Sequence, residues 1–151
     1  MKIGIAADHA GFELKEICKN HLVSHGFAIY DFGAHAYVAT DDYPDCIAPL
    51  AEAISSGEVS RGIAVCGSGV GASIVSNKVP GVRAGLIADT YSAHQGVEHD
   101  DMNMLCLGSR VVGEALAIEI IEAFLRAEYS QEERHQRRLN KVLALEKKYL
   151  V

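Results

Sequence analysis

Short, uninterrupted apolar runs separated by longer amphipathic stretches are the feature that most constrains this chain. The clearest run is 61–66, where Ile63, Ala64 and Val65 follow one another without a polar break. A strand that is apolar on both sides is typical of a parallel sheet covered on both faces by helices. The runs expected to form strands are 2–6, 28–32, 61–66, 84–88 and 105–108.

The segments between these runs have the spacing and end signals of helices. Pro44 begins one such segment, while Gly26 and Gly57 follow the ends of two of them. The alternation predicts an α/β fold of three layers, a doubly wound, Rossmann-like or flavodoxin-like five-stranded parallel sheet, with residues 1–151 as one domain. The helices expected are 12–25, 44–56, 70–77, 91–99, 113–127 and an extra C-terminal helix, 130–149.

The expected C-terminal helix differs from the others in its high charge. Ser130 and Glu133 match a capping box at its start. Its narrow apolar stripe contains Leu139, Val142, Leu143 and Leu150. A charged terminal helix with a narrow apolar stripe is typical of an element that docks on another subunit. The alternative is a tail exposed to solvent.

The charge and the cysteines limit the class of protein. The net charge of -6 argues against nucleic-acid and anionic-membrane partners. The chain enters directly on an apolar strand pattern, with no leader and no run long enough to span a membrane. The four cysteines have neither C-x-x-C nor zinc spacing, so reduced thiols and a cytoplasmic location are expected.

Polar residues follow four of the expected strands. Ligands of open parallel sheets bind beyond the carboxyl ends of the strands, so these residues are the first candidates for a site. They are Asp8, His9 and Gly11, then Cys66 to Gly71, then Asp89 and Tyr91, and finally Ser109 and Arg110.

The loop Cys66-Gly67-Ser68-Gly69-Val70-Gly71 is the strongest local signal. Its glycines allow consecutive N–H groups to point at an anion, either a phosphate or an enediolate oxygen. Cys66 lies where the helix dipole favours a thiolate, so it could abstract a proton, and Ser68 could pass one between oxygens. A purely structural turn is one alternative. A dinucleotide fingerprint formed by Gly67, Gly69, Ala72 and Asp89 is another, although it would follow the third strand rather than the first.

Histidines and arginines supply further candidates. His9 and His99 could act in acid–base steps. Arg134 and Arg138 share a helix face and could bind a phosphate, or instead pair with neighbouring glutamates. Two metal sites are conceivable from residue types alone, one from His99, Asp100 and Asp89 and one from the pair His21 and His25.

Five collinear blocks resemble ribose-5-phosphate isomerase type B, within the wider family that includes galactose-6-phosphate isomerase subunits. They extend over nearly the whole chain, so together they are highly specific. The blocks are Asp8-His9-Ala10-Gly11-Phe12, Asp42-Tyr43-Pro44, Cys66 to Gly71 with Ser73 and Asn77-Lys78, Gly108-Ser109-Arg110-Val111, and Arg134-His135-Gln136 with Arg138.

The resemblance implies an aldose–ketose isomerase without metal or organic cofactor, acting on a phosphosugar. Cys66 resembles the catalytic base, Ser68 the proton relay, and His99 the residue that opens the sugar ring, with Asp8 close by. The resemblance also implies a homodimer, with a tetramer as the alternative, because some site residues come from the neighbouring subunit. The implied substrate and phosphate contacts are His9, Tyr43, Gly67, Ser68, Gly69, Val70, Gly71, Asp100, Arg110, Arg134 and Arg138.

Two positions distinguish branches of this family. Some members replace the cysteine with a glutamate just past the loop, where this chain has Ala72. Many carry Asn where this chain has Asp100, and a carboxylate cannot donate to a sugar hydroxyl as an amide does. The expected reaction interconverts D-ribose 5-phosphate and D-ribulose 5-phosphate through a cis-enediolate. The same chemistry on a six-carbon or four-carbon phosphosugar, and a sensor that binds without turnover, are the alternatives.

Overall fold

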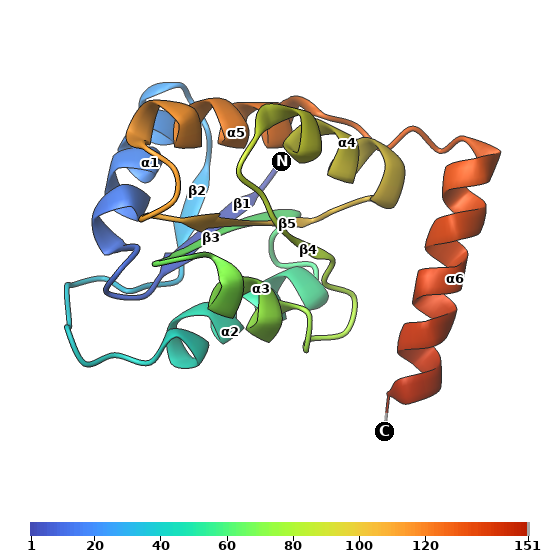
Figure 1. Ribbon diagram of the computed structural model, residues 1–151, viewed down its shortest axis with the longest axis horizontal. Helices are drawn as coiled ribbons and strands as arrows, with labels where there is room; N and C mark the ends of the chain where they lie inside the picture. The colour runs from blue at the N-terminus through green and yellow to red at the C-terminus, as the bar shows by residue number, and fades with distance from the viewer. Residues whose placement is uncertain (151) are drawn as a thin grey trace.

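The sheet predicted from the apolar runs is present in the computed structural model, which describes residues 1–150 (Figure 1). All strands are parallel, and their order is β2-β1-β3-β5-β4. The central strands are the most apolar, and every residue of β1 and β5 is buried. The strands are β1 (Ile3–Ala7), β2 (Ile29–Asp31), β3 (Arg61–Cys66), β4 (Ala84–Leu86) and β5 (Met104–Gly108).

Helices cover both faces of the sheet and bury two separate apolar layers. Helices α1, α4 and α5 lie on one face, and α2 and α3 lie on the other (Figure 1). The helices are α1 (Phe12–Ser24), α2 (Tyr43–Ser55), α3 (Val70–Ser76), α4 (Thr90–Asp100), α5 (Glu114–Arg126) and α6 (Glu133–Tyr149). The three-layer, doubly wound fold is therefore confirmed. Among the described residues, no helix combines the length and the apolar character needed to cross a bilayer.

The strand order locates the place where a ligand is expected to bind. The chain passes from β1 outward to β2, and then returns to the other side of β1 to form β3. Beyond the carboxyl ends of β1 and β3 the two crossovers therefore leave in opposite directions, which opens a crevice between them. The order differs from the flavodoxin order 2-1-3-4-5 only in the exchange of the last two strands.

Helix α6 lies outside the three layers (Figure 1) and contacts them through the end of α4 and through Gly81, whose N–H donates to Glu146 Oε1 at 2.9 Å. It begins at Glu133, so the prediction of a start at Ser130 with a capping box is wrong. Gln131 has a φ of 56°, which a helix cannot contain. The Ser130 hydroxyl also has other partners, because its Oγ lies 2.6 Å from His135 Nδ1 and accepts from the Glu132 N–H.

A fully buried lysine connects α1 to the segment that follows β2. Lys15 Nζ donates to Asp31 Oδ1 at 2.9 Å and to the Ala34 carbonyl at 2.6 Å. Burial opposes ionisation of Asp31, but hydrogen bonds from Lys19, the Gly33 N–H and Lys15 outweigh it and lower the pKa of this carboxyl. Its stabilising effect is therefore complete above the ordinary Asp pKa and is lost as the pH falls through the folded value.

Replacing Lys15 with methionine is expected to lower the free energy of unfolding by about 3 kcal/mol, because the Ala34 carbonyl and Asp31 lose a buried donor. Lys19→Met is the matched control. That side chain is 25% exposed, so its loss should cost less than about 1 kcal/mol. Urea unfolding of the two variants measures the difference, and equal costs would contradict the structural role given to Lys15.

Candidate active site

A pocket of about 390 Å³ lies beyond the carboxyl ends of β1 and β3, where the strand order places the crevice. It brings together candidates from four separate sequence blocks. Its lining residues are Asp8, His9, Ala10, Tyr43, Cys66, Gly67, Ser68, Gly71, Arg110 and Val111.

The glycine loop forms one wall of this pocket and connects β3 directly to α3. Gly69 has a φ of 80°, and a Cβ there would lie 2.9 Å from the backbone carbonyl carbon of Leu107, so the loop requires glycine at this position. This turn directs the Gly69 N–H to Cys66 Sγ at 3.1 Å. The Val70 N–H donates to Ser68 Oγ at 3.2 Å. The loop therefore holds the Cys66 thiol and the Ser68 hydroxyl beside its own backbone N–H groups.

Cys66 differs from the other cysteines in its surroundings. All four are free thiols, but Cys66 is the one that lines the pocket. Burial raises the pKa of Cys18 and of Cys106 to about 12, and burial followed by the charge of Asp41 raises that of Cys46 to about 11. These three remain protonated near neutral pH, which leaves Cys66 as the candidate base.

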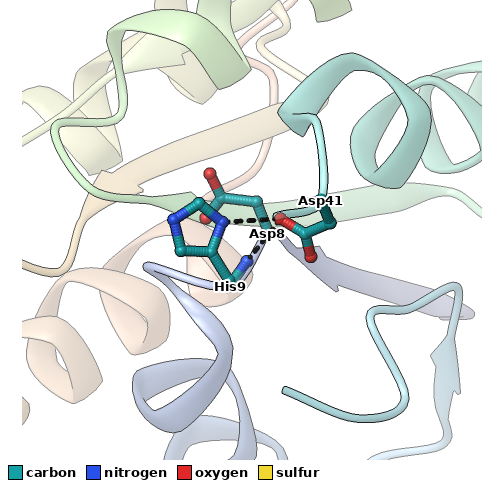
Figure 2. A group of neighbouring side chains, drawn as sticks. All are labelled: Asp8, His9 and Asp41. Carbon is teal, nitrogen blue, oxygen red and sulfur yellow. Dashed lines mark hydrogen bonds and ion pairs between the residues drawn. The ribbon is translucent and has the colours of Figure 1, made fainter. Parts of the chain in front are cut away.

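Two side chains after β1 form the facing wall. Asp8 is 7% exposed, and its Oδ1 accepts from the Gly11 N–H at 3.0 Å. His9 Nδ1 lies 2.6 Å from Asp41 Oδ1, and the same oxygen accepts from the His9 backbone N–H at 3.0 Å. Figure 2 shows the His9 ring beside the Asp8 carboxyl, with Nδ1 turned toward Asp41. Asp41 is thus a site neighbour that the sequence reasoning missed.

Arg110 contributes the cation of this pocket. Its backbone N–H donates to the Gly67 carbonyl at 3.0 Å, which ties the turn after β5 to the glycine loop. A Cβ on Gly67 would lie 3.5 Å from a guanidinium nitrogen of Arg110, so the positive charge lies against the loop. The Tyr43 ring closes the other side, because a Cβ on Gly71 would lie 3.0 Å from it.

Four predicted site residues lie elsewhere. Helix α4 begins at the carboxyl edge of the sheet and ends where β5 begins, so His99 and Asp100 lie at the opposite edge from Cys66. Asp100 lines a second pocket, of about 740 Å³, between α6 and the end of α4. Arg134 and Arg138 are exposed on α6. One chain therefore does not bring these four residues to the glycine loop.

A pair of stacked imidazoles joins α4 to α6. The His99 and His135 rings lie 4.0 Å apart, centroid to centroid, at an interplanar angle of 26°. His135 is 1% exposed, and burial, followed by the charge of His99, lowers the pKa of His135. His99, which is half-buried, therefore stacks on the His135 ring, and the surroundings of that ring favour its neutral form.

The arginines of α6 have different partners. Arg134 Nε donates to Glu132 Oε2 at 2.9 Å. Pairing with a neighbouring glutamate was the alternative to phosphate binding for this arginine. Arg137 makes a two-point contact with Glu133. Arg138 has no ion-pair partner among residues 1–150. The second guanidinium of the predicted phosphate-binding pair is therefore available.

The metal sites suggested by residue type do not form. Asp89 caps the start of α4 by accepting from the Ser92 N–H at 2.7 Å, while His99 and Asp100 end the same helix. That separates them by about 15 Å, too far to share an ion. His21 and His25 stack on each other, and His21 Nε2 contacts Glu122 at 3.0 Å, so this pair belongs to a surface cluster.

Comparisons with known proteins agree with this geometry. Residues 3–142 match the Ribose/Galactose Isomerase family. Ribose-5-phosphate isomerase B of Escherichia coli is 43% identical over 147 residues, which cover 97% of each chain. The structure of the Clostridium thermocellum ribose-5-phosphate isomerase B has a TM-score of 0.95 at 46% identity, covering 99% of this chain and 100% of the other.

A further structure was solved with a sugar phosphate. It is ribose-5-phosphate isomerase B from Mycoplasma genitalium with bound ribulose-5-phosphate, at a TM-score of 0.92 and 39% identity, covering 97% of this chain and 96% of the other. The family inferred from five collinear motif blocks is thereby confirmed. Its characteristic thiol, hydroxyl and glycine loop form one wall of a single pocket. This chain belongs to the ribose/galactose isomerase family.

Proposed function

We propose that this chain interconverts D-ribose 5-phosphate and D-ribulose 5-phosphate through a cis-enediolate. The observation that carries the proposal is the shared wall of Cys66, Ser68 and the loop N–H groups in one pocket. The E. coli relative has this name, and the M. genitalium relative was solved with the ketose phosphate. The four free cysteines are consistent with a cytoplasmic location, which is part of the proposal.

The proton transfers use groups of the glycine loop. The Cys66 thiolate removes the proton from C2 of the open aldose and returns it to C1, which moves the carbonyl by one carbon. Ser68 carries the hydroxyl proton from one oxygen to the other. Backbone N–H groups between Gly67 and Gly71 stabilise the negative charge that develops on the enediolate oxygens. Asp8 and Tyr43 border the sugar from the opposite wall.

A second copy of the chain completes this site in the proposed enzyme. The pocket holds one arginine, Arg110, whereas a sugar phosphate carries about two negative charges. Arg134 and Arg138 of the partner subunit supply the remaining positive charge, and His99 of the partner subunit opens the furanose ring. Both sites of the homodimer are shared in this way.

Helix α6 has the surface that such a dimer needs. Much of its apolar surface remains open to solvent, with Val142 50%, Leu145 57% and Tyr149 71% exposed, although Leu139 of the predicted stripe is buried. These residues line the 740 Å³ groove together with residues of β4 and α4. In the proposed dimer, α6 docks on the second subunit and buries this stripe.

A turnover assay over phosphorylated aldoses tests the proposed substrate. The panel contains ribose 5-phosphate, a four-carbon aldose phosphate, and the 6-phosphates of allose and galactose. Ribose 5-phosphate is expected to have the highest kcat/KM. Preference for another member would assign a different sugar to the same chemistry, and binding of all members without turnover would favour the sensor.

A further inference from the structure

The contact between Asp41 and His9 determines which ring nitrogen of His9 carries a proton, so Asp41 can influence the site through His9. Burial opposes ionisation of Asp41, but hydrogen bonds from the His9 ring and the His9 backbone N–H outweigh it and lower the pKa of this carboxyl. An ionised carboxylate only accepts hydrogen bonds. The 2.6 Å contact between Asp41 Oδ1 and His9 Nδ1 therefore requires a proton on Nδ1.

The hydrogen bond at Nδ1 determines where the second ring nitrogen of His9 faces. With Nδ1 bonded to Asp41, the second ring nitrogen of His9, Nε2, lies on the far side of the ring from the carboxylate (Figure 2). His9 lines the pocket that contains Cys66 and Arg110, and its side chain is 31% exposed. Asp41 is only 13% exposed, so it reaches the pocket through His9.

We propose that Asp41 is a positioning residue for His9, the substrate contact that the family resemblance implies, and that it orients the ring so that Nε2 faces a phosphate oxygen of the substrate. The proposal rests on the proposed function. A carboxylate at Nδ1 fixes the imidazole orientation and stabilises the imidazolium, as it does in Ser-His-Asp triads. The imidazolium then donates through Nε2 beside Arg110, and together they form the part of the phosphate site that this chain supplies itself.

The loop that holds Asp41 is tied to β1 and α1 at its start and forms a turn just before Asp41, which gives the carboxylate a defined place. At its start, the Ala34 N–H donates to the Ala7 carbonyl at 2.7 Å, and the Ala34 carbonyl accepts from Lys15 at 2.6 Å. At its end, the Asp41 N–H donates to the Val38 carbonyl at 3.1 Å. The Tyr37 ring of the same loop lies edge-on to His9, with the centroids 6.3 Å apart.

Kinetics of Asp41→Ala and Asp41→Asn test the positioning role. Loss of a charged hydrogen-bond partner is expected to raise KM for ribose 5-phosphate about tenfold in Asp41→Ala, with kcat changed less than about threefold. Asp41→Asn keeps an accepting oxygen and should lie between wild type and Asp41→Ala. Asp45→Asn, which changes an exposed carboxylate in the first turn of α2, is the matched control and should leave KM unchanged.

Nitrogen-15 NMR of the histidine rings gives a second measurement. Its result would not change with the substitution if Asp41 only stabilised the fold. Without ligand, His9 in the wild-type protein should carry its proton on Nδ1, and Asp41→Ala should shift the proton of the neutral ring to Nε2. Adding inorganic phosphate should convert the wild-type ring to the imidazolium, with both nitrogens protonated, and should do so less in Asp41→Ala.

Each outcome separates this proposal from the proposed function. An unchanged tautomer in Asp41→Ala would overturn the positioning role. If Asp41→Ala changes the His9 tautomer but has the same KM and the same response to phosphate as the wild type, the contact of His9 with substrate is overturned. If no sugar phosphate turns over even in the wild type, the proposed function fails, while the tautomer and the phosphate response still decide the Asp41–His9 pair.

Discussion

Replacement of Cys66 by alanine is expected to lower kcat for ribose 5-phosphate by about 10³-fold, because it removes the proposed general base. KM should change less than about threefold, since the phosphate contacts of the substrate lie elsewhere. The other three thiols cannot replace it, because their surroundings raise their pKa values. Formation of ribulose 5-phosphate measures kcat, and exchange of the C2 hydrogen in deuterium oxide reports the proton abstraction alone.

Cys18→Ala is the matched control for this result. Cys18 is fully buried on α1 and does not line the pocket, so its loss should lower the unfolding midpoint and leave kcat unchanged. Together the two variants separate catalysis from stability. Full activity of Cys66→Ala, or retained exchange of the C2 hydrogen, would show that another group is the base.

Two impaired variants are expected to restore activity, measured at substrate concentrations well below the wild-type KM, when they share a dimer. Arg134→Ala combined with Arg138→Ala should raise KM about 100-fold, by removing two charge-assisted phosphate contacts. A mixed dimer of this variant with Cys66→Ala contains one intact site. After refolding of an equal mixture, about a quarter of all sites are intact, so about a quarter of wild-type activity should return.

The structure supplies a control with the opposite outcome. Cys66 and Arg110 line the same pocket of one chain. A mixed dimer of Cys66→Ala and Arg110→Ala therefore contains no intact site, and its equal mixture should stay inactive. Failure of the first mixture, or equal recovery in both, would contradict sites shared between subunits.

The sequence predicted most of the fold because local patterns determine it. Runs such as 61–66 are apolar throughout, and the matching strand β3 begins and ends at the expected residues. Shorter strands were less well bounded. Strand β4 ends at Leu86 rather than 88, since Ala84 and Gly85 are only partly buried and Leu86 is exposed. The start of α6 was misplaced, since Ser130 has the residue type of a cap but bonds to the His135 ring.

The candidate site was predictable only where it follows a strand directly. Asp8 and Cys66 come at the ends of β1 and β3, so the edge rule for parallel sheets locates them. Asp41 lies on a loop between β2 and α2, and only the folded path of that loop brings it to His9. Its one sequence signal was its place beside Asp42 before α2, which is equally typical of a helix start.

The stacked pair of His99 and His135 has a consequence for substrate choice. It joins the end of α4 to the helix that carries Arg134 and Arg138, and so links the proposed ring-opening group to the proposed phosphate-binding arginines. In the proposed shared site, the reactive carbons lie against the loop of one subunit, and the phosphate lies between His9 and Arg110 of that subunit and the arginines of the other. The length of sugar that fits then depends on how far apart the two subunits hold these groups. Substitutions at the subunit boundary, remote from the sugar, should therefore alter selectivity between five-carbon and six-carbon substrates.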